Sequence, residues 1–174
     1  MATMYSRMKI AGHPIHPMLV AFPIAFYVAA LLGYAIYGAS ENRFWFQLGY
    51  VANVAGVVMA VVAAIPGFID WAVGIPSNSK AKGVGLTHML LNVTALAVFA
   101  INALLQARQW NALVPDSTVA TVLAAIGVGV TIAAGFFGWA LVQTYHVGVD
   151  LSGEQQRDEP RSVPPFETRR PAHR

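Results

Sequence analysis

Four long apolar runs follow one another along the chain, separated by shorter polar connections. They cover residues 18–37, 44–69, 84–105 and 119–145. Each run is close to the roughly 20 residues that an α-helix needs to cross the hydrocarbon core of a bilayer. The pattern therefore predicts an all-α fold, a polytopic membrane protein whose residues 18–149 form an antiparallel bundle of four transmembrane helices.

Small and proline residues add detail to this prediction. Small or polar residues recur about every four positions in the second and fourth runs, which favours close helix packing in lipid. They are Gly49, Asn53, Gly56, Ala60 and Ala64, followed by Gly127, Thr131 and Gly135. Pro23 removes a backbone donor from the first run and predicts a bend near its start.

Polar segments flank the predicted bundle at both ends. Residues 1–17 form a polar lead that ends in Gly-His-Pro-Ile-His-Pro. Because a residue before proline avoids the α region, His13 and His16 are expected in an extended elbow rather than in a helix. Residues 150–174 are rich in charge and proline, so they are expected to form a disordered cytoplasmic tail.

Composition supports a membrane location and excludes several kinds of chemistry. Hydrophobic residues make up 56% of the 174 residues and charged residues 11%, whereas a soluble domain carries about 25% charged residues. The chain contains no cysteine, which excludes disulfides, thiolate metal sites, iron–sulfur clusters and covalent c-type haem attachment. The expected partner is the lipid bilayer and not nucleic acid, since no basic stripe with interleaved aromatic residues occurs. Homo-oligomerisation stays open.

The distribution of basic residues predicts the orientation. The lead, the second connection and the tail would lie on one side of the membrane and carry nine of the 11 Lys and Arg residues. Because positive charge favours the cytoplasmic side, both termini are expected in the cytoplasm of a bacterial inner-membrane protein.

Most of the histidines come together at this predicted cytoplasmic side. His13 and His16 precede the first run, Asp70 follows the second, His88 begins the third and His146 ends the fourth. Ionisable residues at the edge of hydrocarbon usually face protein or water and are usually paired. These five residues are therefore candidate metal ligands.

The third run suggests which side chains point inward. Asn92, Ala95, Phe99 and Asn102 follow His88 at a spacing that places all of them on one helical face. In an up-and-down bundle the first and third helices are diagonal, so His16 and His88 would face each other across the core. His16, His88 and Asn92 are thus candidate cofactor-binding residues.

Several kinds of chemistry fit such a cluster. Histidine and carboxylate suit a divalent transition metal, and two histidines on opposing helices can supply both axial ligands of haem b. A purely structural cluster and a protonatable relay are the alternatives. His146 also has an electrostatic explanation, because the C-terminal end of a helix favours a cation.

These motifs together resemble the DUF2231 family of uncharacterised bacterial four-helix inner-membrane proteins. The resemblance covers about residues 9–150 and is carried by residues 12–20, 22–24 and 66–71, by His88 with Asn92, and by residues 141–149. It implies a link to membrane redox proteins with cytochrome c or Rieske-type partners, and hence to electron transfer. This chain departs from the family pattern at the end of the fourth run, where Ala140 replaces an acid, Tyr145 stands at the histidine position and His146 comes one residue later.

Two functions from different classes follow from these observations. The first is an inner-membrane protein of unknown activity with a His-rich, metal- or haem-binding site linked to redox chemistry. The alternative is a non-enzymatic membrane subunit that binds a protein partner and uses its histidines structurally. An enzyme that acts on lipid or quinone is a third reading, and the sequence does not decide whether the protein is an enzyme.

Overall fold

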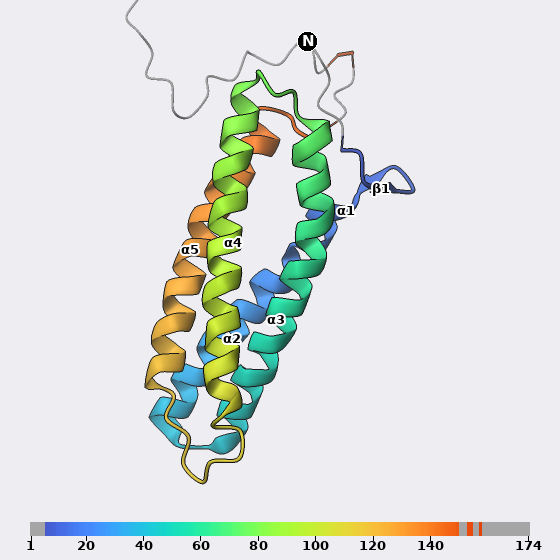
Figure 1. The fold of residues 1–174 in the computed structure, drawn as a ribbon. Helices are drawn as coiled ribbons and strands as arrows, with labels where there is room; N and C mark the ends of the chain where they lie inside the picture. Colours follow the sequence, from blue (N-terminus) through green and yellow to red (C-terminus); the bar gives the residue numbers. More distant parts are fainter. Residues whose placement is uncertain (1–5, 150–152, 155–156, 158–174) are drawn as a thin grey trace, which may run out of the picture.

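The computed structural model describes residues 6–149, 153–154 and 157. Four segments of this part are long and apolar enough to cross a membrane, and they form a bundle (Figure 1). The helices are α1 (Ile15–Leu19), α2 (Ala21–Ser40), α3 (Arg43–Ile69), the π-helical turn η1 (Asp70–Gly74), α4 (Lys80–Ala107) and α5 (Thr118–Gln143). The predicted fold class is confirmed. The expected tail lies mostly outside the described residues.

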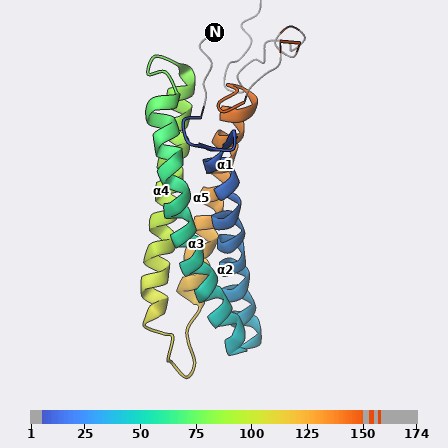
Figure 2. The same ribbon diagram turned by 90° about the vertical axis from the view of Figure 1, so that its right-hand side faces the viewer.

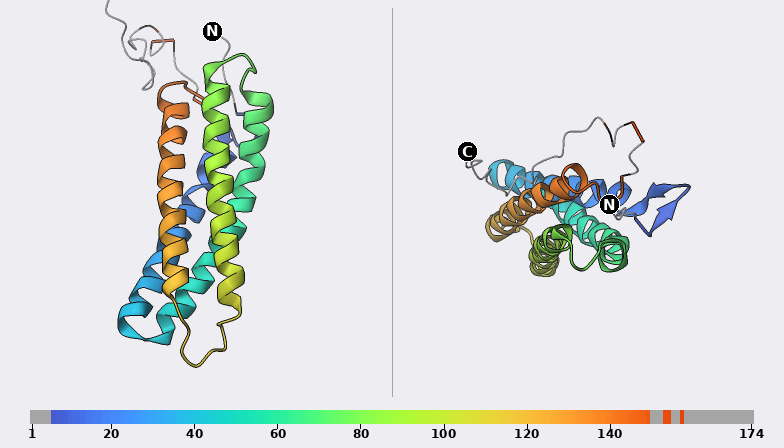
Figure 3. Two further views of the ribbon diagram at one scale, coloured as in Figure 1. Left: turned by 60° about the vertical axis from the view of Figure 1, so that its left-hand side comes forward. Right: turned by 90° about the horizontal axis from the view of Figure 1, so that it is seen from above.

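The four spans pair as two hairpins. The most extensive contacts lie between α2 and α3 and between α4 and α5, and smaller contacts join α2 to α5 and α3 to α4. Figure 2 and the left view of Figure 3 show all four spans running along one bundle axis. The first and third spans are therefore diagonal, as expected, and α1 packs on α3.

The first span is interrupted at Val20, between α1 and α2. Pro23 has no backbone N–H to offer the carbonyl of Leu19, which is the last residue of α1. The interruption lies where the sequence predicted a bend.

The expectation of an extended elbow is right for His13 and wrong for His16. His13 lies in the short strand β2 (His13–Pro14), but His16 lies in α1. Because α1 begins at Ile15, Pro17 falls in its first turn. Backbone N–H groups there have no acceptor within the helix, so proline costs no hydrogen bond. The carbonyl of His16 then accepts a hydrogen bond from Val20 N at 3.1 Å, which outweighs the local preference before proline.

A small hairpin leads into α1 and projects beside the bundle, as the right view of Figure 3 shows. It pairs β1 (Lys9–Ile10) with β2 in antiparallel register, with Ile10 opposite His13. The connecting Ala11 and Gly12 have φ angles of 50° and 82°. Two successive residues with positive φ form the tight turn that matches the natural twist of a hairpin.

The closest packing lies in the half of the bundle remote from α1. Tyr34, Phe46 and Phe99 are fully buried there, and Tyr27 stacks on Phe99 with ring centroids 3.7 Å apart. The buried amide of Asn102 donates to the carbonyl of Ala120 at 3.0 Å. Of the inward stripe predicted on the third run, Ala95, Phe99 and Asn102 are buried along α4.

Candidate functional site

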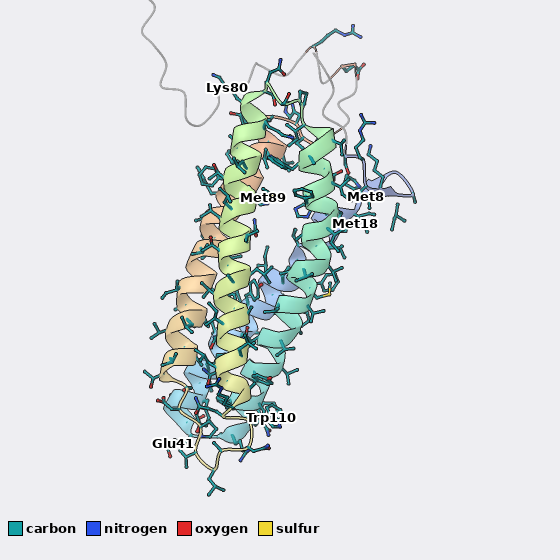
Figure 4. The ribbon with its side chains drawn as sticks, viewed as in Figure 1. Met8, Met18, Glu41, Lys80, Met89 and Trp110 are labelled. Carbon is teal, nitrogen blue, oxygen red and sulfur yellow. The ribbon has the colours of Figure 1, made fainter. Side chains whose placement is uncertain are left out.

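A cavity of about 450 Å³ lies between the α2–α3 and α4–α5 helix hairpins, in the half of the bundle that carries α1. In this half α3 and α4 lie apart (Figure 1). All four spans line the cavity, mainly with apolar or small side chains, among them Val20, Ala64, Leu96 and Gly135. Figure 4 places Met18 and Met89 near this level, and Glu41 and Trp110 at the opposite end.

His16 reaches from α1 to α3. Its Nδ1 lies 2.8 Å from the carbonyl oxygen of Ala63. Its ring packs on Gly67, where an added Cβ would lie 2.7 Å from two ring atoms of His16. A larger residue than glycine at position 67 would displace the ring.

His88 makes the same two contacts between α4 and α5. Its Nδ1 lies 2.8 Å from the carbonyl oxygen of Ala134. Its ring packs on Gly138, where an added Cβ would lie 2.9 Å from the ring atom Cε1. Each histidine is thus held by one helix-backbone carbonyl and one glycine on the neighbouring helix.

These contacts fix the chemistry of both rings. A carbonyl oxygen can only accept, so Nδ1 carries a proton in His16 and in His88, and the neutral form of each ring then has its lone pair on Nε2. The ring centroids lie 6.3 Å apart and the ring planes are inclined by 86°. Two preoriented imidazoles with available Nε2 atoms therefore meet at the cavity.

Asn92 lies beside His88 but does not face its lone pair. The amide nitrogen donates to the backbone carbonyl of His88 at 2.8 Å. It lies 3.4 Å from Nδ1 and 3.2 Å from Nε2 of the same ring. Near-equal distances to both nitrogens place the amide off the axis of either lone pair, so Asn92 lines the cavity and leaves Nε2 open.

The other predicted ligands are engaged elsewhere. Asp70 accepts from Ser6 Oγ at 2.7 Å and from the backbone N–H groups of Arg7 at 2.6 Å and Met8 at 3.1 Å. Its carboxylate fastens the lead to the end of α3. The exposed His13 interacts through Nδ1 with the carbonyl of Ala11 at 3.0 Å, within its own hairpin.

His146 lies beyond the end of α5 and not in its last turn. Its φ angle is 52°, and the next N–H, of Val147, donates to the carbonyl of Leu141 at 2.9 Å. This is the helix-ending geometry in which glycine usually stands. Within the described residues no group of three or more His, Cys, Asp or Glu side chains is placed to hold a metal ion, so the expected cluster of His13, His16, Asp70, His88 and His146 does not form.

Sequence reasoning missed the residues that hold the two rings. Ala63, Gly67, Ala134 and Gly138 supply carbonyls and ring contacts, and neither residue type suggests a site on its own. The available signal was that Ala63 and Gly67 have the same spacing as Ala134 and Gly138.

Comparison with known proteins places the chain in a family without a described activity. No curated protein and no solved structure matches this chain. A family model described as a predicted membrane protein (DUF2231) matches residues 12–151, which include both hairpins and both cavity histidines. The chain therefore belongs to the DUF2231 family of predicted membrane proteins.

Proposed function

We propose that this membrane protein binds one b-type haem between His16 and His88 and carries single electrons between membrane redox proteins. The observation that supports this proposal is the arrangement of the two imidazoles, whose centroids lie 6.3 Å apart. An imidazole Nε2 stands about 2 Å from a bound metal and about 1 Å from its ring centre, so two rings on one metal have centres about 6 Å apart. Two histidines on opposing helices are a common axial pair for haem iron.

The number of ligands favours haem over a bare metal ion. A protein-bound divalent transition metal usually takes at least three protein ligands. No third His, Cys, Asp or Glu of the described residues joins this pair. A porphyrin supplies the remaining four nitrogens itself, so a haem needs only the two histidines.

The cavity has the character that a macrocycle requires. Its volume of about 450 Å³ falls within the usual range for cofactor sites, and its walls are mainly apolar. The small residues Ala60, Ala64 and Gly135 leave room beside the ring pair. A bound haem would supply one-electron chemistry, and His16 and His88 would hold it with rings that the carbonyls of Ala63 and Ala134 orient.

The proposal includes a location. The cavity lies at the end of the bundle that carries Arg7 and Lys9 of the lead and Lys80 and Lys82 at the start of α4. The positive-inside rule then puts the haem near the cytoplasmic face of the bacterial inner membrane, with both termini in the cytoplasm.

An absorption spectrum with elemental analysis tests the proposal. The full chain, expressed in cells supplied with iron and a haem precursor, should copurify with about one haem and show the sharp bands of a six-coordinate b-type centre. His16→Ala and His88→Ala should each abolish this spectrum, whereas His13→Ala and His146→Asn should retain it. Wild-type protein without porphyrin refutes haem binding, and stoichiometric copper or zinc in such a sample would identify a metal site instead.

A second candidate function has its own supporting observation. The Nδ1 bonds already tie α1 to α3 and α4 to α5, so both histidines have a structural use. A non-enzymatic subunit that binds a protein partner would need nothing more from them. In that case His16→Ala and His88→Ala lower stability by about 1–3 kcal/mol each, and the wild-type protein contains neither haem nor metal.

A further inference from the structure

The two cavity histidines belong to a longer series of matched positions. The step along the chain from His16 to His88 is the same as the step from Tyr27 to Phe99, the two stacked rings of the core. The first and third spans therefore carry both rings at the same internal spacing. Each of these two spans thus has a histidine ring at the cavity and an aromatic ring deeper in the bundle.

The second and fourth spans also carry matching residues. The step along the chain between them is one residue shorter than the step from His16 to His88. Gly56, Ala63 and Gly67 of α3 correspond to Gly127, Ala134 and Gly138 of α5, and the step is the same for all three pairs. In both triplets the residue types are identical. The sequence thus contains the same pattern twice, in the same order within each hairpin.

Equivalent residues make equivalent contacts. An added Cβ at Gly56 would lie 2.7 Å from the ring of Tyr27, and one at Gly127 would lie 2.5 Å from the ring of Phe99. The histidine contacts repeat in the same way, with Ala63 and Gly67 around His16 and their counterparts around His88.

The helix crossings match as well. In the first hairpin α2 and α3 approach closely where a Cβ on Gly49 would lie 3.2 Å from the carbonyl of Ala30. By the same two offsets, Gly49 corresponds to Ala120 and Ala30 corresponds to Asn102. These two counterparts are joined by a hydrogen bond of 3.0 Å between α5 and α4. Each hairpin therefore crosses at the same register.

The arrangement of the hairpins completes the pattern. The contact between α2 and α3 is about as extensive as that between α4 and α5, and the two contacts between hairpins are also alike. Figure 3 shows α2 and α4 running in one direction and α3 and α5 in the other, so two equivalent halves would be related by a rotation about an axis along the bundle. Repeats of the same orientation in membrane proteins are related by an axis along the membrane normal.

We infer that the chain is a tandem repeat of one helix-hairpin unit, and that Gly67 and Gly138 are equivalent positioning residues for the histidines on either side of its two-fold axis. Each glycine lets one ring lie against the neighbouring helix and reach the carbonyl four residues earlier. The role of these glycines in haem binding rests on the proposed function, but the repeat and the ring positions do not.

Alanine at either glycine should disturb one histidine and spare the other. The new Cβ would come within 3 Å of ring atoms in both cases, and its position on the helix backbone is fixed. The ring has to move away, which lengthens or breaks its bond from Nδ1 to the carbonyl. Gly129 lies on α5 outside the cavity wall, with no heavy atom within 4 Å of an added Cβ, so it provides a matched control position.

The first measurement is ¹⁵N-histidine NMR of the haem-free full chain in lipid. His13, His146 and His173 are replaced in the background so that two rings remain. Both rings should show protonated Nδ1 and unprotonated Nε2. Gly67→Ala should shift the signals of one ring and Gly138→Ala those of the other, while Gly129→Ala leaves both unchanged. Different tautomers in the two rings, or one variant shifting both rings, would overturn the inference.

The second measurement uses the haem spectrum. Gly67→Ala and Gly138→Ala should each reduce haem content at least tenfold or convert the centre to five-coordinate, while Gly129→Ala keeps the wild-type bands. Circular dichroism checks that each variant stays helical. A wild-type protein that contains no haem contradicts the proposed function alone, because the NMR result then still decides the repeat. Haem loss in only one of the two glycine variants contradicts their equivalence.

Discussion

Replacement of Gly127 by alanine probes the tightest packing in the bundle. An added Cβ would lie 2.5 Å, 2.9 Å and 3.0 Å from three atoms of the Phe99 ring. Carbon atoms normally approach to about 3.5–4.0 Å, so the ring would have to retreat by about 1 Å. This retreat is opposed, because Tyr27 stacks on Phe99 at 3.7 Å with an interplanar angle of 4° and itself packs on Gly56.

The magnitude follows from this lack of space. Overpacking a core that cannot relax costs about 1–3 kcal/mol. Gly129 is the matched control on the same helix, since a Cβ there meets no heavy atom within 4 Å. Alanine at position 129 should stabilise the helix by up to about 1 kcal/mol, because glycine is the weaker helix former. The two variants should therefore differ in unfolding free energy by about 1–4 kcal/mol.

The assay is unfolding in mixed micelles as the fraction of denaturing detergent is raised, followed by circular dichroism. Gly127→Ala should unfold at a lower fraction than the wild type, and Gly129→Ala at an equal or higher one. If Gly127→Ala proves as stable as Gly129→Ala, the stack of rings between two glycines is not the tightly packed unit described above.

Three further predictions concern the ends of the bundle. Asp70→Ala removes the acceptor of the lead, so trypsin should cleave after Arg7 several-fold faster, and an unchanged rate would show that the lead is held by other contacts. Ala11→Asn should slow amide exchange across the β1–β2 hairpin and stabilise this hairpin by about 0.5–1 kcal/mol, because asparagine tolerates positive φ better than alanine. Faster exchange would argue against the turn at Ala11 and Gly12. Topology reporters should be periplasmic at Asn42 and cytoplasmic at Ser79, and the reverse pattern would place the cavity at the other membrane face.

The fold could be predicted because lipid imposes a strong constraint on length and composition. Four runs of about 20 apolar residues can hardly be anything but spanning helices in a chain with so few charges. Helix ends were less predictable, since they depend on individual side chains. α4 begins at Lys80 and not at residue 84, because the side chain of Ser79 accepts from the backbone N–H of Lys82.

The site was predicted in part. The inward direction of His88 and its diagonal relation to His16 followed from helical spacing, and their rings do meet. The larger cluster failed for local reasons that spacing does not encode. Asp70 is engaged by backbone N–H groups of the lead, and His146 ends a helix instead of continuing it.

The carbonyls and glycines around the rings were invisible for a different reason. Any helix residue has a carbonyl, and a glycine in a membrane helix usually means close packing. Only comparison of the second span with the fourth, at a constant offset, separates the pairs Gly56–Gly127 and Gly67–Gly138 from the other glycines of these two helices. Ala63 with Gly67 and Ala134 with Gly138 then stand out as the same pair of residues at equivalent positions.

The role of Asn92 gives the last prediction. The sequence suggested that it binds the cofactor, because it shares the face of His88. Its amide instead donates to the backbone carbonyl of His88 and lies at similar distances from both ring nitrogens. The corresponding residue of the first span, at the offset that relates His16 to His88, is the apolar Val20, so the repeat does not require an amide here.

Asn92→Val should therefore keep the bound haem and its six-coordinate spectrum, because both histidines keep their hydrogen bonds from Nδ1 to a backbone carbonyl. Stability should change by no more than about 1 kcal/mol, since one neutral hydrogen bond is lost and a second apolar residue faces the cavity. His88→Ala, one helical turn away, is the positive control and should lose the spectrum. Loss of haem in Asn92→Val with the helix content retained would show that the amide holds the cofactor directly, and that the two halves of the site are not equivalent.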